Sequence, residues 1–118
     1  MKAPSADLDY HVLAFERTSE AAAFVAALSR FLDSPRGSRY MTSAEAVQLW
    51  IQPERADGRI EVYLTDAALA ATSTAFAPVT VTGTRPGRAL PADAALLIGG
   101  SRAPAWGAAE AERRLAGP

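Results

Sequence analysis

The sequence contains no cysteine and a single histidine, His11. Without cysteine the chain has no thiolate nucleophile, no disulfide and no zinc finger. Its 12 basic and 13 acidic residues leave a formal net charge of -1, so charge does not attract it to nucleic acid or to an anionic membrane. It also lacks an apolar run near the roughly 20 residues of a membrane helix. The first residues have no apolar signal segment, so we expect a cytoplasmic protein.

What is present is the composition of an ordinary globular protein. The chain has 118 residues, 49% of them hydrophobic, which fits one small folded domain. Alanine supplies much of the apolar content, so we expect a thin core that a partner surface would help to stabilise. We expect an N-terminal lead over residues 1–9, an α+β domain over residues 10–100 and a C-terminal extension over residues 101–118.

Residues 47–52 and 59–65 alternate apolar and polar side chains, which predicts two strands that each bury one face. The polar loop between them ends in Asp-Gly at positions 57–58, which is typical of a β-hairpin. If Gln52 lies opposite Arg59, the apolar residues of both strands share one face of the hairpin. These apolar residues are Leu49, Ile51, Ile60 and Val62.

Three other segments have the pattern of strands. Residues 10–16 carry apolar side chains on both faces, which predicts a central strand. Residues 79–82 alternate valine and threonine, which predicts another strand that Gly83 closes. Residues 94–98 form a short apolar run that is either a fifth strand or the end of a helix.

Helical patterns separate the predicted strands. Residues 18–33 place apolar side chains three and four positions apart, with a threonine and a serine at the start as N-cap candidates. Pro35 ends this helix. A second helix is expected over residues 67–76 with Asp66 as its N-cap, and a short third one over residues 104–115.

The predicted order is strand, helix, strand, strand, helix, strand. This order resembles the ferredoxin-like class over residues 10–83. The resemblance implies an antiparallel sheet with both helices on one face, so that Phe24, Leu28 and Leu32 cover the apolar side of the hairpin. The remaining residues would form an irregular or short-helical C-terminal extension. The class includes too many activities for the role of any residue to be transferred.

The opposite face of the predicted hairpin combines aromatic, amide and acidic side chains. These residues are Gln48, Trp50, Gln52, Glu61 and Tyr63. Such a mixture suits a partly desolvated interface with a second copy or with another protein. Coverage by the chain's own C-terminal residues is an equally strong alternative. The leading hypothesis is a non-catalytic interaction module that forms a homodimer or binds a protein through this face.

His11 carries the alternative hypothesis of an enzyme. In a ferredoxin-like dimer that encloses a small-molecule pocket, His11 would act as general base and Arg85 or Arg88 as anion clamp. No serine-nucleophile motif, phosphate loop or metal-ligand spacing is present. The sequence therefore favours a protein that is not an enzyme, and we expect no metal and no cofactor.

The basic residues of the last third carry another alternative. Arg85, Arg88 and Arg102 would together bind an anion, and beside Trp50 they would suit single-stranded nucleic acid. However, Glu61 would repel phosphate at this place, and the strand lacks the aromatic pattern of RNA-recognition sheets. Nucleic acid is therefore the least favoured partner.

Overall fold

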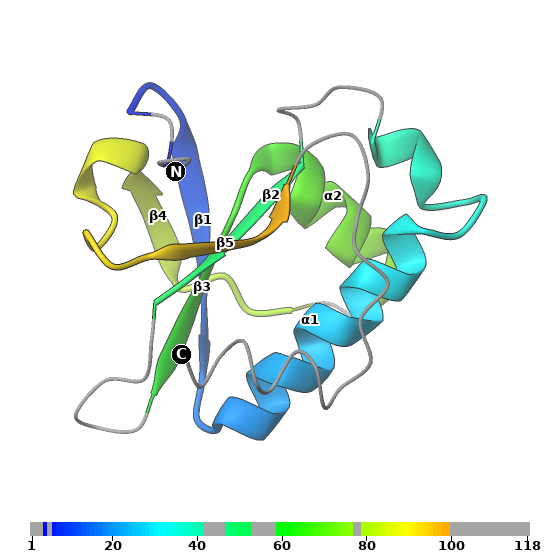
Figure 1. The fold of residues 1–118 in the computed structure, drawn as a ribbon, viewed down its shortest axis with the longest axis horizontal. Coiled ribbons are helices and arrows are strands. Elements are labelled where there is room, and N and C mark those ends of the chain that lie inside the picture. The colour runs from blue at the N-terminus through cyan, green and yellow to red at the C-terminus, as the bar shows by residue number, and fades with distance from the viewer. Residues whose placement is uncertain (1–3, 5, 42–46, 53–58, 77–78, 100–118) are drawn as a thin grey trace.

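The computed structural model describes residues 4, 6–41, 47–52, 59–76 and 79–99. Within them the chain forms a small α+β domain with a five-stranded antiparallel sheet (Figure 1). The strands are β1 (Asp9–Phe15), β2 (Gln48–Ile51), β3 (Ile60–Leu64), β4 (Gly83–Pro86) and β5 (Ala95–Gly99). The helices are α1 (Thr18–Leu32), α2 (Asp66–Ala75) and the short 3-10 helices η1 (Ser38–Met41) and η2 (Gly87–Ala89).

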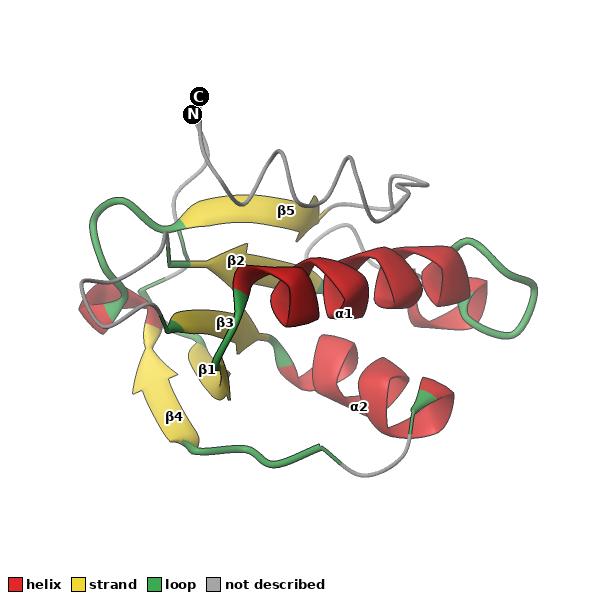
Figure 2. Cartoon of the chain, turned by 90° about the horizontal axis from the view of Figure 1, so that it is seen from below, coloured by secondary structure: helices red, strands yellow, loops and turns green. Residues whose placement is uncertain are grey.

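The strands lie in the order β4-β1-β3-β2-β5. Both α-helices pack on one face of this sheet, and the connection that contains η2 lies on the other side (Figure 2). The β2–β3 hairpin was predicted correctly, and the segment that the sequence left open between strand and helix is the strand β5. The predicted helix 104–115 and the extension 101–118 lie outside the described residues.

The main core lies between the sheet and the two helices. The helix residues Phe24, Leu28 and Leu32 belong to the same buried cluster as the apolar hairpin residues, as the periodicity predicts. Leu28 and Ile60 are completely buried. The hairpin members of this cluster are Leu49, Ile51, Ile60, Val62 and Leu64.

The turn after α1 requires a glycine. The helix ends at Leu32, before Pro35, and the Gly37 N–H donates to the hydroxyl of Ser34 over 3.1 Å. A Cβ atom at Gly37 would lie 1.8 Å from the carbonyl oxygen of Phe31, so any side chain there would force the backbone apart. At the predicted end of the helix, the backbone at Gly37 therefore lies close to the backbone at Phe31.

Three local predictions were wrong. The hairpin register pairs Leu49 with Leu64 and Ile51 with Val62, a shift of two residues from the predicted one. A two-residue shift leaves every side chain on its face, so the alternation cannot detect it. The helices start elsewhere as well: the N-caps of α1 and α2 are Arg17 and Thr65, without side-chain cap hydrogen bonds.

The strand expected over residues 79–82 is the third correction. On the side of β1 away from β3, the paired strand is β4, which starts at Gly83, the residue that was expected to close the predicted strand. Residues 79–82 lead into β4 from the side of the sheet on which α2 lies (Figure 2). Strand propensity at 79–82 is therefore overridden, because this segment has to carry the chain from the helix layer back to the sheet.

Candidate functional site

The sheet face that α1 and α2 do not cover carries a layer of polar and aromatic side chains, which we call the polar face. Its residues are Tyr10, Gln48, Trp50, Gln52, Glu61, Tyr63 and Arg85. Period-two alternation places them here, opposite the apolar core. The sequence predicted this grouping for the hairpin residues, but it gave no sign of Tyr10 as a member.

The polar face is largely buried. Trp50 is 1% exposed and Tyr63 is 0% exposed, and only Gln52 among the predicted interface residues is half-buried. Leu90 belongs to the same buried cluster as both aromatic residues, and Ala94 and Leu96 pack against this cluster. Of the two alternatives that the sequence left open, this burial matches coverage by the chain's own later residues.

One hydrogen-bond group on the polar face is centred on Gln48. Its Oε1 accepts from the Tyr10 hydroxyl at 2.7 Å and from Trp50 Nε1 at 2.9 Å. Tyr10 belongs to β1 and Gln48 to β2, with β3 between them, so the first bond spans a whole strand. Because buried donors without an acceptor are costly, Gln48 allows two large aromatic side chains to be buried here.

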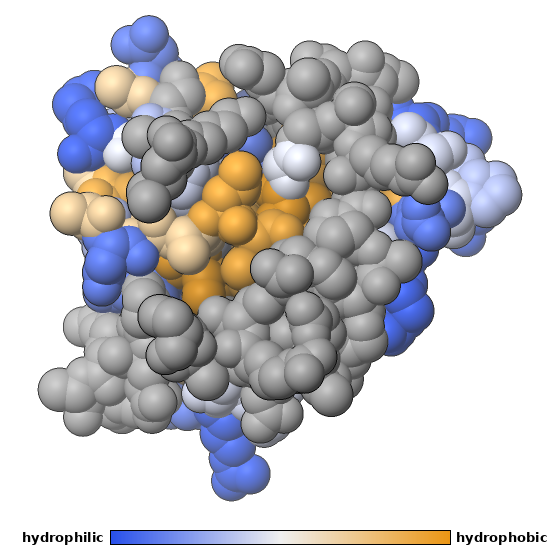
Figure 3. Space-filling model, in the orientation of Figure 1, coloured by the Kyte–Doolittle hydropathy of each residue, from blue (hydrophilic) through white to orange (hydrophobic). Residues whose placement is uncertain are grey.

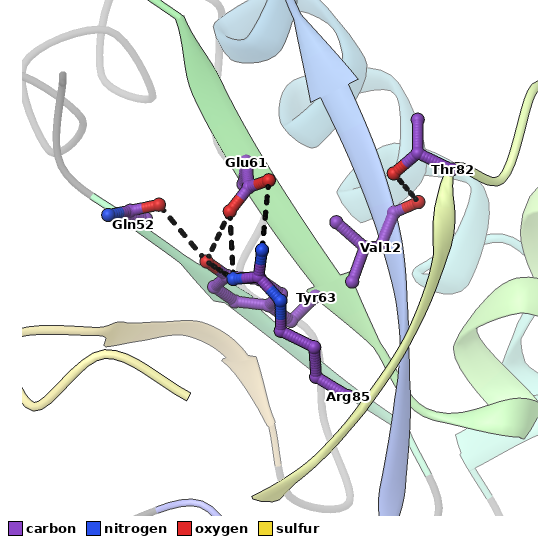
Figure 4. Close-up of polar contacts among 6 residues, drawn as sticks. All are labelled: Val12, Gln52, Glu61, Tyr63, Thr82 and Arg85. Carbon is purple, nitrogen blue, oxygen red and sulfur yellow. Dashed lines mark hydrogen bonds and ion pairs between the residues drawn. The ribbon is translucent and has the colours of Figure 1, made fainter. Parts of the chain in front are cut away.

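A second group ties β4 to β3 (Figure 4). Arg85 Nη1 donates to Glu61 Oε1 at 3.0 Å, and the Tyr63 hydroxyl donates to the same oxygen at 2.9 Å. The guanidinium carbon lies 5.9 Å from the centre of the Tyr63 ring, and Gln52 Oε1 lies 3.2 Å from the Tyr63 hydroxyl. Since β1 separates β4 from β3, the Arg85 side chain reaches across a strand.

In this arrangement Arg85 forms an ion pair with Glu61. The Glu61 side chain is 11% exposed and that of Arg85 is 41% exposed, so Arg85 neutralises a carboxylate that water reaches poorly. Of the other predicted anion ligands, Arg88 is exposed in η2 and Arg102 lies outside the described residues. An incoming anion would have to compete with Glu61 for Arg85.

His11 lies on the opposite face of β1 from the polar face. Its Nε2 atom is 2.5 Å from Asp66 Oδ1 at the start of α2, and its cross-strand neighbours are Leu64 and Thr84. Asp66, which the sequence suggested only as a helix cap, is thus the partner that orients the imidazole. Because His11 and Arg85 point to opposite faces of the sheet, the two cannot hold one substrate together.

No group of three or more metal-ligating side chains occurs among the residues that the structure describes. Within the same residues, no helix has both the length and the apolar character needed to span a membrane. No protein-family model, no curated protein and no solved structure matches this chain.

An exposed, uncharged surface lies where the chain enters β4. Residues 80–84, here called the outer flank, are all exposed and uncharged. The backbone N–H and the hydroxyl of Thr82 both donate to the Val12 carbonyl, at 2.8 and 3.1 Å, and so fix the outer flank to β1 (Figure 4). Val81 is 37% exposed and Leu8 is 38% exposed, a matched pair of exposed large apolar side chains at separate places.

An apolar area lies at the other end of the strand order. In the view of Figure 3, hydrophobic side chains gather at the centre over β5, while hydrophilic ones lie around the rim. In β5, Ala95 is exposed and Leu96 is partly exposed. The described residues therefore show uncharged surface near both edges of the sheet.

Proposed function

We propose that this protein is a non-catalytic interaction module that self-associates. The observation that supports this most strongly is the outer flank, an exposed and uncharged segment that leads into the edge strand β4 and forms its first two residues. Native sheets usually protect their edges with charged residues, proline or bulges, because an unprotected edge binds other strands. Here Arg85 and Pro86 protect only the C-terminal part of β4.

The proposed contact surface differs from the one that the sequence suggested. Trp50 and Tyr63 are buried in one cluster with Leu90, so a partner would first have to displace part of the chain to reach them. The outer flank needs no such rearrangement. We therefore place self-association at the outer flank and assign Trp50 to the core of the single chain.

The proposal includes a ferredoxin-like interpretation of the fold. In its favour are the order β1-α1-β2-β3-α2-β4, the antiparallel pairing and the position of both helices on one face. Under this interpretation β5 is an additional strand beside β2. The fold class contributes no activity to the proposal.

Sedimentation velocity over the micromolar concentration range tests self-association. We expect the weight-average mass to rise with concentration from the 12.4 kDa of one chain toward twice that value. A mass that stays at one chain over the whole range would contradict the proposal.

A general-base role for His11 is the second candidate, and the contact with Asp66 favours it. A carboxylate on one ring nitrogen orients the imidazole, as in many proton-transfer sites. Titration of small uncharged aromatic compounds, followed by the NMR shifts of the His11 ring, tests this candidate. Shifts that saturate in the parent protein but not in Asp66→Asn would support it, and unchanged shifts would remove it.

A further inference from the structure

We infer that the C-terminal residues 101–118 of this chain dock on its own domain, as a helix that lies beside α1 and over the helix side of β5. This inference goes beyond the proposed self-association and does not depend on it. The docking surface consists of described residues from α1 and β5. Its α1 part is formed by Ala22, Ala26 and Ser29, here called the small-residue side of α1.

The small-residue side of α1 is buried although it faces away from α2. The exposed fractions of Ala22, Ala26 and Ser29 are 1%, 1% and 0%. The contact with α2 lies about 150° further around the helix. There the Phe24 ring lies 5.5 Å from the ring of Phe76 at the end of α2. The burial of the small-residue side therefore calls for a second neighbour of α1.

The described residues place no helix on this side of α1. Figure 2 shows α1 over the middle of the sheet and α2 toward β4, with no described helix over β5. Nevertheless Ile98 and Leu97 of β5 are only 0% and 8% exposed, and both belong to the cluster between the sheet and the helices. The helix side of β5 and the small-residue side of α1 thus form a buried corner that still lacks a described cover.

Ser29 supplies an independent observation. Its Oγ atom is buried and has no hydrogen-bond partner within the described residues. A buried hydroxyl without a partner is costly and rare in native structures. Ser29 lies in the last turn of α1, so the unexplained polar atom is at the C-terminal end of the small-residue side.

The strand directions bring the C-terminal residues to this corner. Strands β3 and β5 both pair antiparallel with β2, so they end at the same end of the sheet. α2 follows β3, whereas α1 follows β1, which is antiparallel to β3. A helix after β5 would therefore run in the direction of α2 and antiparallel to α1. It would begin beside the last turn of α1, where Ser29 lies.

The length of the C-terminal segment fits this path. Residues 100–103 span up to about 13 Å when extended, enough to rise from the sheet to a layer about 10 Å away. Residues 104–115, for which the sequence predicts a helix, would then extend for about 18 Å along α1.

The side chains of residues 104–115 also fit this surface. Ala108, Ala111 and Leu115 are three and four positions apart, so they share one face of a helix, and Arg113 lies on the opposite face. Helices approach most closely where the side chains between them are small, as on the small-residue side of α1. The segment thus combines an apolar face for the corner with a charged face for water.

Pairs of cysteines in the full chain test the docking, because the natural sequence has none. Ala26→Cys would be combined with Ala108→Cys or with Ala111→Cys. The control combines the same two changes with Ala27→Cys, which lies about 100° further around α1. A disulfide needs Cα atoms within about 7 Å, so we expect at least one Ala26 pair to close within one chain about tenfold faster than its Ala27 control.

A charge substitution gives a second measurement that needs no oxidation. Ala111→Glu places a charge on the face that docks and should lower the urea midpoint of the full chain. Arg113→Glu changes a charge on the opposite face and should leave the midpoint unchanged.

Faster closure of the Ala26 pairs within one chain, together with a lower midpoint for Ala111→Glu, supports the docking. Preferential disulfides between two chains would overturn it, because a second copy would then occupy the corner. Equal rates for the Ala26 and Ala27 pairs, with equal midpoints for Ala111→Glu and Arg113→Glu, would overturn it as well.

Discussion

The two faces of the sheet bury side chains of different chemistry. The face beneath α1 and α2 buries aliphatic side chains such as Leu28 and Val62, which need only to exclude water. On the polar face, Tyr10 and Trp50 are buried with their polar atoms hydrogen-bonded to Gln48. Truncation of a buried side chain should therefore destabilise the fold through lost packing on the first face and through lost hydrogen bonds on the second.

The largest effect is expected in the apolar core. Leu28→Ala should lower the free energy of unfolding by about 2–5 kcal/mol, because a completely buried leucine leaves a cavity. Urea denaturation measures this loss. Arg30→Ala, an exposed change on the same helix, should alter stability by no more than about 0.5 kcal/mol. Equal losses in the two variants would contradict the assigned core.

Gln48→Leu should produce the next largest effect, on the polar face. The change keeps the approximate volume but removes the oxygen that Tyr10 and Trp50 share, at a cost of about 1–3 kcal/mol. Urea denaturation with tryptophan fluorescence measures it. Gln52→Leu is the matched control and should cost less, because Gln52 is only half-buried. A neutral Gln48→Leu would show that Gln48 does not support the aromatic layer.

Arg85→Met should produce a smaller effect on the same face. It leaves Glu61 without this cation and should cost about 1 kcal/mol, at the low end for a charge pair because Arg85 is partly exposed. Combining it with Glu61→Gln should recover part of the loss, which a double-mutant cycle of unfolding free energies measures. Arg88→Met, exposed in η2, is the control and should be nearly neutral. Additive losses in the cycle would show that the ion pair does not contribute.

The apolar face was accessible from the sequence, and the polar face only in part. Leu49 and Ile51 alternate with polar residues at a period of two, and this pattern alone predicts which side chains of the strand share a face of the sheet. The same period cannot distinguish pairings that differ by two residues, and the hairpin register was therefore missed. The pairing of Arg85 with Glu61 was missed for another reason: it joins residues from β4 and β3 across β1.

The burial of Trp50 in one cluster with Leu90 also depends on a contact between distant parts of the chain. Nothing local to Leu90 indicates that it packs on a strand far earlier in the chain. In the same way, the contact of His11 with Asp66 depends on where α2 begins relative to β1. Sequence patterns predicted which side chains share a face, whereas contacts between distant segments required the three-dimensional structure.

One pair of variants tests most directly the central claim that the outer flank is where copies of this chain meet. Val81→Lys and Leu8→Lys each replace a similarly exposed apolar side chain with the same charge, but Leu8 lies outside the outer flank. Sedimentation should show that Val81→Lys stays at the mass of one chain while Leu8→Lys associates like the parent protein, with unchanged melting temperatures for both. Association of Val81→Lys as strong as that of the parent would contradict the claim.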